Sequence, residues 1–443
     1  MKDDVKDVAN LSFNARYFDR YFMHELEWSE WQPIINELQK NITDEIIDEA
    51  MLEFPEEVRS MSDADLAGKL KSRRDKLESI GKKLYDFLSE EVEIPATDNN
   101  DRFYVTIEDN GNVQVQMFVE RKEKGDLLKY DRTFYPGETK EIRMYGLRGK
   151  DEFVISGSGK TKITIRVIGG EDKDKIENKT QGVKIAVYDE TGGIGIMGLG
   201  IKDYTSNSVG VNDYDRTGFK YNTGTFFPTF GWTPDDGFWI GAMTANTNHG
   251  WRKTPYRLNQ AFSFSVAPGG QDAFKVKYTG RYPKILGALD FTPDIQIDFP
   301  RNENFFGLGN ESVNDAEERA FNWVRIGSIE ITPLWTISSK DNSTSFSFGP
   351  AYESQDIKKT ENRVSVDEIL GFTEEEFGRR HFLGGQLAFE SGFVDNPVFP
   401  AYGFQLGASL GYLNTLSIDE EVLEFSTAVH TYIGSAEKVK IRH

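Results

Sequence analysis

The sequence predicts a mostly β protein, in which an antiparallel transmembrane β-barrel of about ten strands follows a helical segment and a small β domain. Three observations support this class. The 443 residues include 41 Gly, 32 Phe and 18 Tyr, an abundance typical of all-β architectures. Apolar and polar residues alternate over long stretches of the second half. No apolar run is long enough for a transmembrane helix, so any crossing would be made by strands.

Composition and charge exclude several classes of function. The chain has 72 acidic and 52 basic residues and a net charge of -20. This charge would repel a phosphate backbone, so we expect no nucleic-acid partner. There are no cysteines, which excludes disulfides and cysteine-ligated metals. The amino terminus, MKDDVKDVAN, is charged and does not resemble a signal peptide, so the chain is expected to be cytoplasmic or a piece of a longer precursor.

Changes in periodicity divide the chain into four segments. Residues 1–95 keep a helical period, with Thr43 as a helix cap before an apolar stripe. Residues 96–180 switch to period two, and Asn110-Gly111 between alternating runs predicts a hairpin. Residues 181–224 are expected to be a linker leading into the barrel. Residues 225–443 hold the barrel strands.

The barrel prediction depends on which face of each strand would contact lipid. The alternating stretch Ala401–Tyr412 is longer than an ordinary strand and reaches the ~9–11 residues that cross a bilayer. Its polar face is rich in Gly and Ser, which suit a lumen, and Tyr402 and Tyr412 lie at the two ends of its apolar face. The predicted lipid-facing residues, including those of the hairpin within Tyr256–Gly280, are Phe262, Phe264, Tyr402, Phe404, Leu406, Leu410 and Tyr412. A soluble β-sandwich also alternates, so a secreted β-rich binding protein remains the alternative.

Several motifs in the second half carry a family resemblance. They are TPDDGFWIGAM at Thr233–Met243, HGWRKTPY at His249–Tyr256, NFFGLGNE at Asn304–Glu311 and FNWVRIGSIEITP at Phe321–Pro333. In this order they resemble the barrel of the BamA/TamA outer-membrane assembly superfamily, the bacterial surface antigens. TDEIIDEA, LKSRRDKL and ETKEIRMYGLRGKDEFVISG, further upstream, resemble the segment that joins this barrel to a calcineurin-like phosphoesterase in large outer-membrane proteins.

The resemblance implies an outer-membrane location, with residues 1–180 in the periplasm. It implies a role in assembly or export of outer-membrane proteins, or in anchoring an attached phosphoesterase. The expected partners are outer-membrane lipid and other outer-membrane or periplasmic proteins. The metal-ligand motifs of the phosphoesterase are absent, and the chain ends in VKIRH without a terminal aromatic. We therefore expect a fragment of a barrel of about sixteen strands, with edges formed by unpaired strands at Gly237–Asn248 and Ala436–His443.

Two glycine-containing motifs are expected to form connections at the rim of the barrel. One comprises Asp235, Asp236 and Gly237, which predict a turn into a strand. The other comprises Phe306, Gly307, Leu308, Gly309 and Asn310, whose glycines permit a positive φ in a tight connection. Both are predicted to serve backbone shape rather than chemistry.

The sequence contains one set of metal candidates and no catalytic set. YGLRGKDEF at Tyr145–Phe153 and GGEDKDKIE at Gly169–Glu177 approximate a calcium-binding β-helix repeat, which makes Asp151, Asp172 and Asp174 weak calcium candidates. GSGKT at Gly157–Thr161 precedes a strand pattern rather than a helix, so no nucleotide is expected. The five histidines are scattered, and no nucleophile lies near a base by spacing. We expect no cofactor other than calcium and no chemistry within these residues.

Overall fold

The structure is a computed structural model in which the chain divides into two units, Met1–Phe219 and Lys220–His443. Side chains at 56, 58–64 and 375 are not described. The backbone is described for residues 4–5, 7–121, 124–207, 212–269, 273–307, 309, 319–339, 341, 343–363, 372, 374–396, 398–416 and 421–433.

Six helices open the first unit, as the helical period predicts. They are α1 (Val8–Ser12), α2 (Arg16–Phe22), α3 (Trp28–Asn41), α4 (Asp44–Leu52), α5 (Glu56–Asp75) and α6 (Leu77–Ser89). The Thr43 side chain accepts a hydrogen bond from the Ile46 backbone N–H at 3.4 Å, which confirms the predicted cap. Trp31 and Ile35 of α3 pack with Tyr85 and Leu88 of α6 in a small core.

The rest of the first unit is a two-sheet coil of strands, which we call the solenoid. Its strands are β1 (Glu91–Pro95), β2 (Asp101–Ile107), β5 (Glu141–Leu147), β6 (Glu152–Gly157), β7 (Thr164–Gly170), β8 (Asp174–Asn178), β9 (Lys184–Tyr188), β10 (Ile194–Gly198) and β11 (Ile201–Asp203). The chain alternates between two sheets of parallel neighbours, β1-β5-β7-β9-β11 and β10-β8-β6-β2. Buried aliphatic and aromatic side chains fill the space between the sheets.

An antiparallel hairpin interrupts the coil after its first turn. It consists of β3 (Val113–Val119) and β4 (Leu127–Phe134), which extend the second sheet beside β2. Gly111 has a φ of 89°, as the predicted Asn-Gly turn requires. The expected linker, 181–224, needs correction, because β9, β10 and β11 lie within it and continue the solenoid. Their short strands and irregular spacing hid the repeat.

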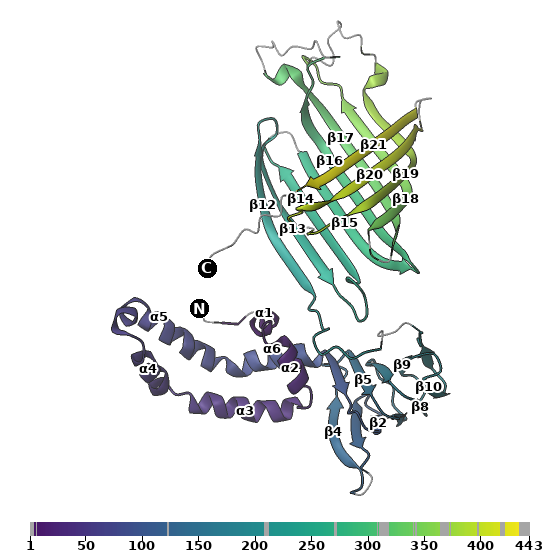
Figure 1. Cartoon of the computed structure of the whole chain (residues 1–443). Helices are drawn as coiled ribbons and strands as arrows, with labels where there is room; N and C mark the ends of the chain where they lie inside the picture. Colours follow the sequence, from purple (N-terminus) through teal and green to yellow (C-terminus); the bar gives the residue numbers. More distant parts are fainter. Residues whose placement is uncertain are drawn as a thin grey trace. The chain divides into compact units, whose positions relative to one another are not determined.

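The second unit is a ten-stranded antiparallel sheet in sequence order (Figure 1). Its strands are β12 (Thr223–Thr233), β13 (Gly237–Asn248), β14 (Leu258–Ala267), β15 (Ala273–Leu286), β16 (Leu289–Asn304), β17 (Trp323–Ser338), β18 (Thr344–Lys358), β19 (Gly378–Val394), β20 (Tyr402–Thr415) and β21 (Glu421–Ile433). Short 3-10 helices, Arg319–Asn322 and Glu374–Glu376, lie in two connections. The mostly β class, with a ten-stranded antiparallel sheet, is confirmed.

The two edges of this sheet differ from the expected ones. The first strand is β12 rather than Gly237–Asn248, which is β13 and pairs on both sides. The expected last strand, Ala436–His443, lies outside the described residues. Over the described strands, β12 and β21 are the two ends of the sheet and no pairing closes it into a barrel.

Connections differ in length between the two ends of the sheet. At the end where β12 begins, residues 249–257, 287–288, 339–343 and 395–401 join neighbouring strands. At the opposite end, the connections include 234–236 and the two longest ones, 305–322 and 359–377. In the described part of the chain, no helix is both long and apolar enough to cross a membrane.

Candidate functional site

One face of the ten-stranded sheet carries a row of apolar side chains that runs from strand to strand in register. We call it the apolar band. From β14 to β17, its register neighbours are Phe264, Val276, Ile297 and Ile329. From β17 to β19 they are Ile331, Tyr352 and Leu383. From β19 to β21 they are Leu387, Leu410 and Phe425.

The side chains predicted to face lipid all lie on the face of the apolar band and are exposed. Their exposed fractions run from 37% for Leu406 to 65% for Tyr402. The complete set is Phe262, Phe264, Tyr402, Phe404, Leu406, Leu410 and Tyr412. Alternation along each strand fixed this face, and the register then joined the strands into one surface.

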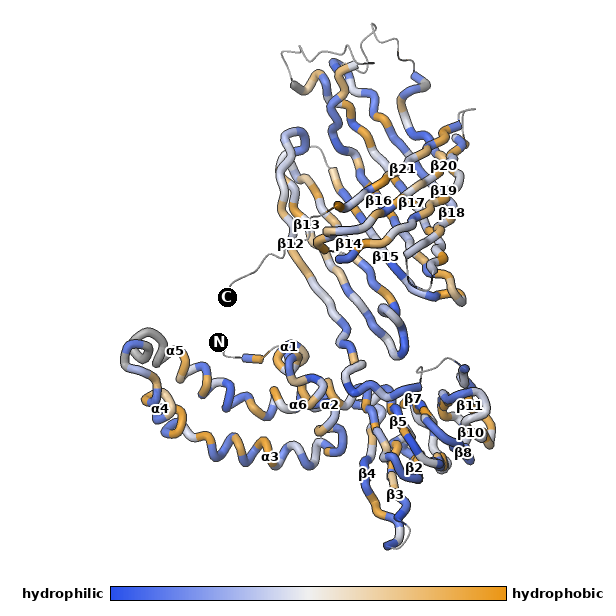
Figure 2. Tube along the Cα trace, viewed as in Figure 1, coloured by the Kyte–Doolittle hydropathy of each residue, from blue (hydrophilic) through white to orange (hydrophobic). Residues whose placement is uncertain are grey.

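The opposite face is polar along the same strands. Register neighbours from β14 to β18 include Ser263, Lys277, Gln296, Glu330 and Glu353. Figure 2 shows the resulting alternation of hydropathy along the traces of these strands. A sheet with one apolar and one polar face needs an apolar environment on one side only.

The first predicted rim motif is hydrogen-bonded to two distant strands at one end of the sheet. The Asp236 side chain is buried, and its Oδ1 accepts a hydrogen bond from the Asn302 backbone N–H at 3.0 Å. The neighbouring Asp235 accepts from the Asn304 amide at 3.2 Å and from the Trp323 indole N–H at 3.0 Å. The turn at 234–236, which we call the rim turn, is therefore fastened to β16 and β17, although β14 and β15 lie between them in the sheet.

The described residues of the glycine motif lie beside this junction, in the connection between β16 and β17. Phe306 is exposed, and Gly307 and Gly309 have φ values of 112° and 86°. Gly237, after the rim turn, has a φ of 80°. These values lie in the left-handed region that glycine adopts without strain. Leu308 and Asn310 lie outside the described residues.

The calcium candidates separate into two environments in the first unit. Asp151 and Asp174 are 1% and 2% exposed; Asp151 stands directly before β6, Asp174 begins β8, and they lie one above the other in the solenoid. Asp172 is exposed on a turn, where its carboxylate accepts a weak bond from the Gly149 N–H at 3.4 Å. The structure therefore does not bring the three carboxylates together as a cage. Across the described residues, no group of three acidic or histidine side chains is placed to hold a metal ion.

Two further aspartates that sequence reasoning missed complete a stack with Asp151 and Asp174. Asp101 and Asp189 are both fully buried. Asp101 begins β2, where it is in register with Asp151, directly before the neighbouring strand β6. Asp189 directly follows β9, at the register position that Gly146 and Gly169 hold within β5 and β7. We call Asp101, Asp151, Asp174 and Asp189 the aspartate ladder. Its sequence signal was a small residue or glycine five positions before an aspartate, repeated at Ala96, Gly146 and Gly169.

Backbone hydrogen bonds hold one oxygen of each rung of the ladder. The Asp101 N–H donates to Asp151 Oδ1 at 2.7 Å, and the Asp151 N–H donates to Asp174 Oδ1 at 2.8 Å. Asp189 Oδ1 accepts from the Glu190 N–H at 2.6 Å. The second oxygens, Oδ2 of Asp151, Asp174 and Asp189, are buried and have no hydrogen-bond partner in the described part of the protein.

Glycines make room for these second oxygens. A Cβ on Gly146 would collide with Asp151 Oδ2, and a Cβ on Gly169 would collide with Oδ2 of both Asp174 and Asp189. Neither glycine has a positive φ, so close approach rather than backbone conformation explains them. Two carboxyl groups from consecutive turns thus converge on Gly169.

Burial is the main influence on the ionisation of the ladder. It raises the pKa of Asp151 to about 9, and Asp174, Asp101 and Asp172 add to this by repulsion. It raises the pKa of Asp174 to about 7 and that of Asp189 to about 6. Desolvation disfavours the charged form of a carboxyl group, and neighbouring carboxylates disfavour it further.

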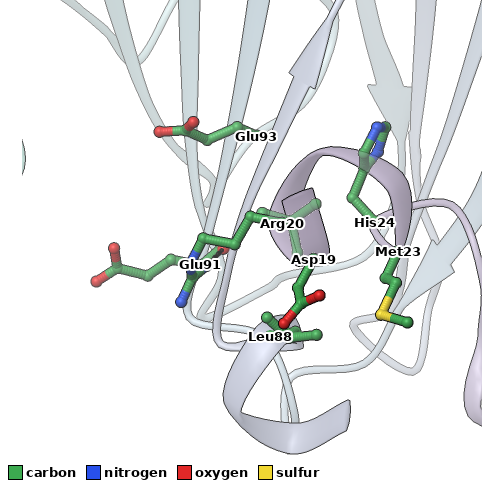
Figure 3. Close-up of a pocket in the computed structure, with 8 residues that line it drawn as sticks. Asp19, Arg20, Met23, His24, Leu88, Glu91 and Glu93 are labelled. Atoms are coloured by element: carbon green, nitrogen blue, oxygen red, sulfur yellow. Dashed lines mark hydrogen bonds between the residues drawn. The ribbon is translucent and has the colours of Figure 1, made fainter. Parts of the chain in front are cut away.

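A small hollow lies between α2, the end of α6 and β1 (Figure 3). Residues that line it include Arg20, His24, Leu88 and Glu93. The Arg20 guanidinium donates to the Glu91 carbonyl at 3.1 Å. The cavity volume is about 10 Å³, the lower bound for a single water molecule, so it does not accommodate a substrate.

A second buried charge cluster of the first unit is paired internally. Arg143 is 4% exposed and bridges Glu91 at 2.7 Å, Glu93 at 3.1 Å and Glu141 at 2.6 Å. Its hydrogen bonds satisfy the requirement for burying a charge.

Comparisons with family models, with curated proteins and with solved structures find no match to this chain.

Proposed function

We propose that residues 220–443 form part of the wall of a transmembrane β-barrel in an outer membrane, with lipid covering the apolar band. The observation that carries the proposal is the continuity of this band from β14 to β21 on a single exposed face. A water-soluble surface rarely exposes apolar area on this scale, and a bilayer removes it from water.

Strand length and connections support the same function. Strands β13 to β21 have between 10 and 17 residues, whereas about 9–11 residues suffice to cross a bilayer at a tilt. The two longest connections, 305–322 and 359–377, lie at the same end of the sheet, as the long loops of outer-membrane barrels do. The face opposite the apolar band would line the lumen.

The role that fits this proposal is the one implied by the BamA/TamA resemblance. The barrel would take part in assembly or export of outer-membrane proteins, or would anchor an attached phosphoesterase. Residues 1–180 would lie in the periplasm, where they could contact other periplasmic or outer-membrane proteins. We assign no catalytic reaction to these residues. The alternative is a soluble β-rich binding protein whose apolar band is covered by another protein.

Single-cysteine labelling tests lipid contact directly, because the chain has no native cysteine. Leu410→Cys lies on the apolar band and Ser409→Cys lies on the opposite face of the same strand. Each variant would carry a fluorophore in vesicles containing nitroxide-labelled lipid. We expect strong quenching at position 410 and little at 409. Equal quenching at both positions, or complete removal of the protein from the vesicles by alkaline carbonate, would contradict the proposal.

A further inference from the structure

We propose that the aspartate ladder retains a proton at neutral pH, on Asp151 above all, and that the solenoid is therefore a pH-responsive element that loosens as the pH rises. The four side chains are between 0% and 2% exposed. Four buried negative charges would lie on neighbouring turns if all were ionised. Burying an uncompensated charge costs far more than protonating the group, so a carboxyl in this setting becomes neutral.

The charged groups around the ladder offer no compensation. The titratable side chains that act on Asp151 are Asp101, Asp172 and Asp174. Those that act on Asp174 are Asp172 and Asp189, and Glu190 acts on Asp189. All of them are acidic. Over the described residues, no ion pair links a Lys, Arg or His to any of the four ladder carboxyls.

Hydrogen bonding leaves a place for the proton. Asp151 and Asp174 each have one oxygen bonded by a backbone N–H and one buried oxygen without a partner. A protonated carboxyl keeps one acceptor oxygen for the backbone N–H and carries its hydrogen on the other. A carboxylate would require a donor for its second oxygen as well, and the described neighbours supply none.

The same geometry disfavours calcium as the neutralising ion. Calcium binds about six to eight oxygen ligands, so its site needs room for several oxygens to converge on one ion. Here Asp174 Oδ2 and Asp189 Oδ2 lie against Gly169, and Asp172 stands apart on the surface. A proton needs no such space.

The sign of the pH dependence follows from the raised pKa values. A raised pKa means that the folded state binds more protons than the unfolded state, in which an aspartate has a pKa near 3.9. The stabilisation is complete below that value and declines as the pH rises through about 6, 7 and 9, the folded-state values for Asp189, Asp174 and Asp151. The solenoid should therefore lose stability from mildly acidic to alkaline pH.

Infrared spectroscopy of the full chain in detergent would show the protons themselves. We expect a protonated-carboxyl carbonyl band at neutral pH that shrinks in Asp151→Asn and fades in the wild type as the pH is raised. Asp172→Asn, which removes an exposed neighbour whose repulsion only adds to the effect of burial, should reduce the band far less than Asp151→Asn does. Absence of the band in the wild type would overturn the proposal, even if the asparagine variants fail to fold.

Hydrogen exchange of peptides from β6 and β8 supplies the second measurement. After correction for intrinsic rates, protection should fall between pH 6 and pH 9 in the wild type. It should fall less in the double variant Asp151→Asn, Asp174→Asn. Loss of the infrared band together with increased protection on addition of calcium at neutral pH would overturn the proposal in favour of a cation site.

Discussion

The indole N–H of Trp323 donates a hydrogen bond to Asp235 Oδ1 at 3.0 Å, across 88 residues of sequence. The bond joins the rim turn between β12 and β13 to the first residue of β17. Asp236 makes the parallel link to the Asn302 N–H. Because strands β14 and β15 stand between these elements, the sheet must curve strongly at this end to let them meet.

Trp323→Phe tests whether this bond fastens the rim turn. The substitution keeps an aromatic ring and removes the donor, so we expect a loss of about 1–3 kcal/mol of local stability. The measurement is hydrogen exchange of the peptide that contains residues 234–237 in the solubilised chain. Trp232→Phe on β12, where the ring is 69% exposed, is the matched control and should change little. Equal protection in the two variants would show that the turn is held by other contacts.

Gly169→Ala should destabilise the solenoid by about 1–3 kcal/mol, because the added Cβ would collide with two carboxyl oxygens. Gly68→Ala in α5 is the control, since a Cβ at that position would have no atom within 4 Å. That helical change should be neutral or stabilise by about 1 kcal/mol. Denaturant titration monitored by hydrogen exchange of β8 separates the two effects. A tolerated Gly169→Ala would mean that the carboxyls of Asp174 and Asp189 do not converge there.

His24 should make the first unit less stable in acid. Burial and the neighbouring Arg132 lower the pKa of His24 to about 4, below its usual value of 6.5. The unfolded state then binds more protons than the folded state between these values, so stability falls as the pH drops from 6.5 towards 4.

His24→Phe should remove this acid sensitivity, because phenylalanine does not titrate. The new ring can still stack on Tyr130, as His24 does with a centroid distance of 5.5 Å. The Tyr130 hydroxyl and Arg132 donate to the carbonyl oxygen of residue 24, which any substitution retains. Exchange protection of β4 measured between pH 4 and pH 7 checks the prediction. The ladder acts in the opposite direction over this pH range, so the difference between the wild type and the variant isolates the contribution of His24. Unchanged acid sensitivity in the variant would show that another group causes the loss of stability in acid.

Leu406→Arg should impair folding into vesicles by about 2–4 kcal/mol if the residue lies near the bilayer midplane. Gln405→Arg, on the opposite face of β20, should cost much less, because a lumen face tolerates charge. The folded fraction in vesicles at graded denaturant concentrations measures both. Equal penalties would indicate a sheet that is buried on both faces.

The sequence by itself determined which side of each long strand is apolar. Alternation is a local property, so Phe404 and Leu406 share a face whichever strand lies next to them. The Thr43 cap and the Asn110-Gly111 turn were equally local, since each depends on residues within one helical turn or one hairpin. The first strand of the sheet was missed because Thr223–Thr233 contains Pro228 and two glycines, which weaken a strand pattern.

Only the tertiary structure decided which distant residues meet. Asp101 and Asp151 are register neighbours although the β3–β4 hairpin separates them in the chain, and Asp189 takes a position that glycine holds in earlier turns. The number of residues between successive ladder positions therefore varies along the sequence, whereas in the solenoid these positions lie on neighbouring turns. Burial also depends on the closed stack: an aspartate in a Gly/Asp turn is ordinarily solvated, and its pKa rises only when neighbouring turns exclude water. The physical reason is that register and desolvation are collective properties of packed strands, which no short segment contains.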